Sequence, residues 1–163
     1  HETGLDALRP LRPKFLSYVL SFIFIGIYWN NHHHLFQAVR QINGRILWAN
    51  MNLLFWLSLI PFATGWMGEN HFAPWPVALY GMSLLLTGVA YVILCRVLIT
   101  CQGADSTLSA AIGRDFKGKA SLVLYAVAIS LSFVNTWIAC ALYVLVVTMW
   151  LIPDSRIEKR LSG

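Results

Sequence analysis

The sequence predicts an all-α integral membrane protein with a single transmembrane domain, in which five visible helices cross the bilayer. The chain of 163 residues is 58% hydrophobic and only 12% charged, whereas about 25% of a typical soluble domain is charged. Its long apolar runs approach or exceed the roughly 20 residues that cross a bilayer as a helix. Its Lys and Arg residues gather in alternate connections, which is typical of cytoplasmic loops.

The first two predicted spans cover residues 15–39 and 46–66, with a short polar connection between them. The first span is largely apolar from Phe15 to Trp29, and its later apolar residues recur at the spacing of a helix. The second span contains Pro61 near its far end. Because the connection is short, we expect these two helices to be antiparallel neighbours.

The third predicted span covers residues 77–99. Gly81 and Gly88 are one heptad apart within it, which predicts close packing of this helix against a neighbour. The connection that follows, residues 100–119, is the longest and most polar. We expect a short amphipathic segment within it at Ser106–Ile112.

Residues 120–152 are almost continuously apolar and would form about 50 Å of helix. A bilayer core is only about 30 Å thick, so the chain must turn back within this run. Asn135 and Thr136 are the polar pair near its middle. We therefore predict a tight turn there, between two short spans at residues 120–134 and 137–152.

The distribution of basic residues predicts the orientation of the chain. When successive connections are placed on alternate sides, one side receives nine of the 12 Lys and Arg residues, which are Arg40, Arg45, Arg96, Arg114, Lys117, Lys119, Arg156, Lys159 and Arg160. The other side receives Arg9, Arg12 and Lys14. The basic side and the C-terminus are therefore predicted to be cytoplasmic. On the outer side, Trp66, Trp75 and Tyr80 are expected to form an aromatic belt.

The same alternation places residue 1 outside the cell. Residues 1–10, "HETGLDALRP", have neither the basic start nor the apolar core of a signal peptide. We therefore expect a further helix ahead of this sequence, which would give a subunit of six spans with both ends in the cytoplasm.

Composition also excludes several partners and cofactors. The formal net charge of +5 is explained by the Lys and Arg residues of the loops predicted to be cytoplasmic. It therefore does not indicate a nucleic-acid partner. Cys95, Cys101 and Cys140 show no Cys-x-x-Cys spacing, and they predict neither a disulfide framework nor a metal site.

A polar cluster, "YWNNHHHLF", ends the first apolar run at residues 28–36. Successive side chains on a helix point about 100° apart, so the three adjacent histidines cannot converge on one metal ion. Trp29 shares a face with His32 and His33, and Asn50 is expected at the same level of the second span. We predict a hydrogen-bonded cluster of Trp29, His32 or His33 or both, and Asn50. The alternative is a hydrated helix end without a specific partner.

Four segments in this order resemble one known family: "YWNNHHHLF" (28–36), "NMNLLFWLSLIPF" (50–62), "VALYGMSLLLTG" (77–88) and "ALYVLVVTMWLIPDSRIEKR" (141–160). They are similar to the prokaryotic members of the transmembrane protein 175 family, which are potassium channels. The resemblance runs from about Arg12 to Arg160. It implies a six-helix subunit, a homotetramer around a central pore in the plasma membrane, passive K⁺ conduction and no cofactor.

The resemblance also concerns the pore. In this family the first helix lines the pore and carries an Arg-x-x-x-Phe-Ser-Asp motif, which this sequence does not contain. The sequence therefore names no pore-lining residue. The resemblance implies that Trp29, His32 or His33, and Asn50 pack against that motif and hold the pore helix in place.

The alternatives to a channel are a secondary transporter and a membrane-embedded haem protein or enzyme. A secondary transporter would favour internal repeats and charged, broken helices near the midplane. A membrane-embedded haem protein or enzyme would need histidines on facing helices or paired acid–base groups. The predicted spans show none of these features, so the sequence predicts a channel subunit with no catalytic residue, no metal ligand and no enzymatic activity.

Overall fold

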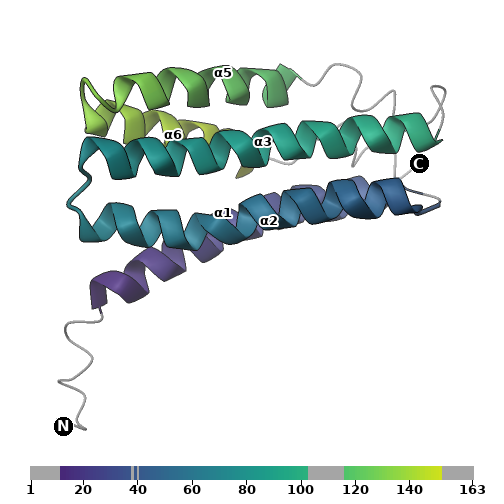
Figure 1. Ribbon diagram of the computed structural model, residues 1–163, viewed down its shortest axis with the longest axis horizontal. Helices are drawn as coiled ribbons and strands as arrows, with labels where there is room; N and C mark the ends of the chain where they lie inside the picture. Colours follow the sequence, from purple (N-terminus) through teal and green to yellow (C-terminus); the bar gives the residue numbers. More distant parts are fainter. Residues whose placement is uncertain (1–11, 38, 40, 103–115, 152–163) are drawn as a thin grey trace, which may run out of the picture.

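The computed structural model describes residues 12–37, 39, 41–102 and 116–151, and every regular element among them is an α-helix. The helices run back and forth along one axis (Figure 1). In chain order they are α1 (Arg12–Gln37), α2 (Gly44–Glu69), α3 (Pro74–Gln102), α5 (Phe116–Leu131) and α6 (Thr136–Leu151). The all-α prediction is thereby confirmed for the described residues.

The predicted turn between the last two helices is present but begins earlier than expected. The chain turns at residues 132–135, because α5 ends at Leu131 and α6 begins at Thr136. Asn135 closes the turn through its backbone N–H, which donates to the Leu131 carbonyl at 2.8 Å. It also caps α6: its side-chain oxygen accepts hydrogen bonds from the backbone N–H groups of Trp137 (3.0 Å) and Ile138 (3.3 Å). These groups have no partner within the helix, which explains why asparagine is preferred at this position.

Helix length and apolarity single out two membrane-crossing candidates among the described helices. They are α2, with 26 residues, and α3, with 29 residues. The shorter α6 is apolar but has 16 residues, and α1 ends in its polar cluster. The prediction of five spans is thus supported only as an all-helical chain with two helices of sufficient length and apolarity. The predicted segment Ser106–Ile112 lies outside the described residues.

The five helices form a bundle with α3 near its centre. On one side α3 packs along α2, and on the other it packs along α5, which forms a hairpin with α6. The remaining helix, α1, lies mainly against α2, and its N-terminal half diverges from the other helices (Figure 1). As a consequence, Phe15 and Tyr18 near the start of α1 are largely exposed.

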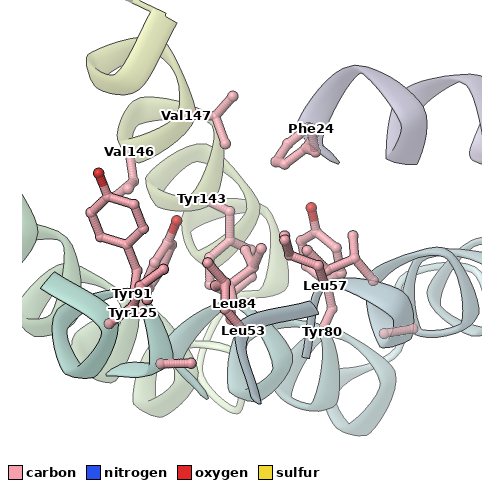
Figure 2. Packing of buried hydrophobic residues seen from close by; sticks show 14 of the residues in the cluster. Phe24, Leu53, Leu57, Tyr80, Leu84, Tyr91, Tyr125, Tyr143, Val146 and Val147 are labelled. Atoms are coloured by element: carbon pink, nitrogen blue, oxygen red, sulfur yellow. The ribbon is translucent and has the colours of Figure 1, made fainter. Parts of the chain in front are cut away.

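Tyrosine and leucine side chains from all these helices fill the core, as Figure 2 shows for part of the cluster. The ring of Tyr80 packs edge-on against Phe24 of α1 and Tyr143 of α6, with ring centroids 6.2 and 5.5 Å apart. Tyr80 was expected in an outer aromatic belt, but it is buried. Trp66 and Trp75 are exposed, as a belt requires.

Close packing at the two α3 glycines is confirmed. A Cβ atom at Gly81 would overlap the Tyr143 hydroxyl group and the side chain of Ile129, and one at Gly88 would lie 2.9 Å from a Leu122 methyl carbon. The Tyr143 hydroxyl can therefore reach across α3, where it donates a hydrogen bond of 3.2 Å to the backbone carbonyl of Val77. Gly81 thus sets the position of α6 on α3.

We predict that Gly81→Ala destabilises the bundle by about 1–3 kcal/mol, because the added methyl group displaces Tyr143 from a filled core. Gly65→Ala is the matched control, since a Cβ there meets no atom within 4 Å. It should be neutral or slightly stabilising, because alanine favours a helix more than glycine does. Unfolding of the purified protein in detergent measures both variants. Equal stability of the two would contradict the role of Gly81.

Candidate functional site

The polar end of α1 is joined to α2 by a hydrogen bond between side chains. The segment between the two helices is short, so they run antiparallel and His32 lies level with Asn50. The Nε2–H group of His32 donates to the side-chain oxygen of Asn50 at 2.6 Å, and both residues are half-buried. An amide oxygen can only accept, so this contact fixes the proton on Nε2 of the imidazole.

A second pair lies on a different face of α1. The rings of Trp29 and His33 are stacked, with centroids 5.1 Å apart and planes inclined by 11°. The side-chain amide of Gln37 donates a hydrogen bond of 2.9 Å to Nε2 of His33, at the edge of the imidazole ring. The side chain of Trp29 is 59% exposed, so this pair faces away from the bundle.

The structure thus divides the four predicted residues into two pairs. The sequence did not predict which histidine forms a hydrogen bond with Asn50. In the structure His32 bonds to Asn50, and His33 stacks on Trp29. The division follows from the 100° rotation between adjacent positions of a helix, which prevents His32 and His33 from facing the same partner. The first pair fixes α1 on α2, and the second presents an aromatic surface to the outside.

The exposed pair continues into an aromatic stripe along α1, formed by Phe15, Phe22 and Trp29. These residues are seven positions apart, and they are exposed by 64%, 66% and 59%. A Cβ atom at Gly26, beside the stripe, would meet no atom within 4 Å, so this face of α1 has no covering helix among the described residues. Sequence reasoning missed the stripe, although its seven-residue spacing was a visible signal.

Further polar contacts tie the neighbouring connection to the end of α3. Asn43 caps α2 by accepting a hydrogen bond of 3.1 Å from the backbone N–H of Ile46, and it donates one to the sulfur of Cys101 at 3.2 Å. Gln102 donates to the backbone carbonyl of Gln41 at 2.9 Å. The start of α2 and the end of α3 are thereby held together, at the same end of the bundle as the His32–Asn50 contact.

Charge differs between the two ends of the bundle. Arg45, Arg96, Lys117 and Lys119 lie on the portions of α2, α3 and α5 that share the end just described. At the opposite end, the connection at residues 70–73 and the turn at residues 132–135 contain no Lys or Arg, and the basic residues there are Arg12 and Lys14 at the start of α1. This asymmetry is the one that the positive-inside rule associates with a cytoplasmic side.

Among the residues that the structure describes, no three His, Cys, Asp or Glu side chains lie close enough together to hold a metal ion. What the described site provides is a helix-to-helix contact and an uncovered aromatic face. Both features lie on a bundle with two helices that are long and apolar enough to cross a membrane.

Comparison with known proteins identifies the family. The family description "Endosomal/lysosomal potassium channel TMEM175" matches residues 1–61. A potassium channel of Chryseobacterium sp. (strain P1-3) is 54% identical over 156 residues, which are 96% of this chain and 81% of that protein. The chain therefore belongs to the TMEM175 potassium channel family, and the resemblance drawn from the sequence is confirmed.

More distant relatives agree with this assignment. A potassium channel of Chamaesiphon minutus is 27% identical over 143 residues, covering 83% of this chain and 70% of that protein. One of Streptomyces collinus is 28% identical over 92 residues, covering 52% of this chain and 43% of that protein. No solved structure matches the chain.

We predict that His32 and Asn50 are energetically coupled by about 1 kcal/mol, a typical value for a hydrogen bond between membrane helices. A double-mutant cycle tests this: His32→Ala and Asn50→Ala should each lower stability, and the double variant should lose less than the sum. The matched cycle with His33→Ala and Asn50→Ala should be additive. Additivity in both cycles, measured by unfolding in detergent, would show that the contact contributes nothing.

Proposed function

We propose that this chain is a subunit of a potassium channel that conducts K⁺ passively across the plasma membrane. The observation that carries the proposal is its 54% identity, over 96% of its length, to a bacterial protein named as a potassium channel. A transporter and a membrane haem protein or enzyme were the alternatives, and the relatives' names favour neither.

In this proposal all five described helices cross the bilayer. The 26 residues of α1 are long enough, at about 39 Å, to cross a core of roughly 30 Å. The 16 residues of α5 and of α6 extend only about 24 Å each. They form a hairpin beside the longer helices, where local thinning of the bilayer accommodates a short span. The basic end of the bundle, to which α6 returns, is assigned to the cytoplasm, and with it the C-terminus.

The aromatic stripe of α1 supports a role for this chain as the scaffold of a pore. Large aromatic side chains at a seven-residue spacing form a suitable surface for a further helix. In this proposal, the pore-lining helix that carries Arg-x-x-x-Phe-Ser-Asp packs on that surface. Four subunits are arranged around one pore. Within the described residues, the Trp29 indole N–H has no acceptor, so it is free to bond a hydroxyl or carboxylate of that motif.

The two pairs at the polar end of α1 then have complementary tasks. The His32–Asn50 hydrogen bond holds α1 in one rotation on α2. That rotation directs the Trp29–His33 stack outward, towards the proposed pore helix. Loss of either pair would loosen the scaffold without touching the permeating ion, because neither pair is assigned to the pore wall.

The proposed function predicts passive, potassium-selective flux from the full-length protein in liposomes. Vesicles loaded with K⁺ should lose it down its gradient without a coupled ion, and K⁺ flux should exceed Na⁺ flux. Protein-free vesicles give the lower limit of the K⁺ flux, and vesicles treated with a potassium ionophore give its upper limit. A saturable flux that requires a proton or Na⁺ gradient would indicate a transporter. Absence of any cation flux from correctly inserted protein would contradict the channel.

A separate prediction concerns the outward-facing pair. Trp29→Ala and His33→Ala should each lower K⁺ flux per inserted protein about tenfold, as expected when a contact worth about 1.4 kcal/mol is lost from a helix interface. Asn30→Ala is the matched control, because Asn30 is adjacent to Trp29 in sequence and takes part in no ring contact or side-chain hydrogen bond among the described residues. Wild-type flux from Trp29→Ala and His33→Ala would show that the pair does not support the pore.

A further inference from the structure

A small cavity lies inside the bundle where α1 approaches α3, α5 and α6. Two of its lining residues, Phe24 of α1 and Val147 of α6, are labelled in Figure 2. The cavity holds about 20 Å³ of free volume, and none of the described residues that line it is a Lys, Arg, Asp, Glu or His. One water molecule requires roughly 10–15 Å³ measured in this way, so the volume is sufficient for one small molecule.

Two tyrosine hydroxyl groups meet at the cavity wall. The hydroxyl oxygens of Tyr28 on α1 and Tyr125 on α5 are 3.2 Å apart. Only one of the two protons can lie in this hydrogen bond, so the hydroxyl that accepts it retains a proton to donate. Within the described residues, neither hydroxyl has another hydrogen-bond partner. The pair therefore offers one unused donor at the cavity.

Asn31 lines the same cavity and offers an acceptor. Its side chain is 8% exposed, and its amide nitrogen donates to the backbone carbonyls of Ile27 (2.9 Å) and Trp150 (3.2 Å). Both amide protons are thereby used, which also fixes the orientation of the carboxamide. Its side-chain oxygen has no donor within the part of the chain that the structure describes. Tyr28 and Asn31 are three residues apart and thus share a face of α1.

Ser121 also lines the cavity, and its hydroxyl proton is already used. Its hydroxyl donates to the backbone carbonyl of Lys117 at 2.7 Å and accepts from the indole nitrogen of Trp150 at 2.9 Å. Among Tyr28, Asn31, Ser121 and Tyr125, the one unused O–H donor therefore belongs to the tyrosine pair, and the one acceptor atom without any donor is the Asn31 side-chain oxygen.

We propose that this cavity is a binding site for a small neutral hydroxyl group, which accepts a hydrogen bond from the Tyr28–Tyr125 pair and donates one to the Asn31 side-chain oxygen. Water supplies this hydroxyl in the protein at rest. A short primary alcohol supplies the same group, and its one or two carbon atoms lie against the apolar walls at Phe24 and Val147. An ammonium or carboxylate ligand would find no opposite charge among the described residues of these walls.

The occupant would connect helices that otherwise make few polar contacts. The Tyr28–Tyr125 bond joins α1 to α5, and the bond from Asn31 to the Trp150 carbonyl joins α1 to α6. A hydroxyl group between Tyr28–Tyr125 and Asn31 links these two contacts into one network. Replacement of water by an alcohol would therefore alter how firmly α1 is held against the α5–α6 hairpin. The proposal does not depend on ion conduction.

A structure of the full-length protein at a resolution that shows ordered water provides the first test. Without alcohol, a single density peak should lie about 3 Å from a tyrosine hydroxyl and from the Asn31 side-chain oxygen. With 2-fluoroethanol present, an elongated peak in the same place would identify the alcohol as an occupant, and an unchanged peak would assign the site to water alone. A cavity with no density in both conditions would overturn the proposal.

Fluorine NMR of 2-fluoroethanol with the purified protein measures the site in solution. Val147→Phe fills the cavity and should weaken binding about tenfold, whereas Val144→Phe, on the exposed side of α6, should leave it within about twofold. Because the larger residue at Val147 can also impair folding, a second variant removes only the two donors. Tyr28→Phe with Tyr125→Phe should weaken binding to a similar extent, and Tyr18→Phe on the exposed part of α1 is its control. Equal binding by the double variant and its control would refute the assigned contacts.

Discussion

Buried polar side chains in this bundle must find hydrogen-bond partners within the protein, because the interior of a bilayer supplies none. Among the described residues, no fully buried side-chain nitrogen or oxygen lacks a partner. Most serine and threonine hydroxyls meet this requirement locally. Thr64, Ser83 and Thr87, for example, each donate to the backbone carbonyl four residues earlier. Such bonds stabilise a side chain in its own helix but do nothing to position one helix on another.

The few polar contacts between helices therefore have a disproportionate effect on the arrangement. His32 with Asn50 joins α1 to α2, Asn31 with the Trp150 carbonyl joins α1 to α6, and Tyr143 with the Val77 carbonyl joins α6 to α3. Packing between apolar side chains is tolerant of small rotations, whereas a hydrogen bond fixes both distance and direction. These contacts determine which face of α1 is turned outward, and hence where the aromatic stripe of α1 lies.

Continuous apolar runs in the sequence predicted the helices correctly. Helix ends and the burial of single side chains were predicted less well. The apolar runs identified all five described helices, and the short connection placed His32 level with Asn50. The polarity of Asn135 correctly marked the turn before α6, but not that α5 ends as early as Leu131 or that the Asn135 side chain caps the following helix. Tyr80 was assigned to the surface because tyrosine is common at membrane interfaces. Its burial depends on Phe24 and Tyr143, which are far away in the chain.

By itself, the sequence determined an all-α chain, the basic end of the bundle and membership of a potassium channel family, because composition, charge distribution and family motifs are properties of the chain as written. Only the tertiary structure decided that His32 faces α2 while His33 faces outward. It also decided that the Tyr28–Tyr125 pair and Asn31 meet at one cavity. Both results depend on the rotation of each helix about its own axis. That rotation is fixed by contacts between residues far apart in sequence, which no local pattern records.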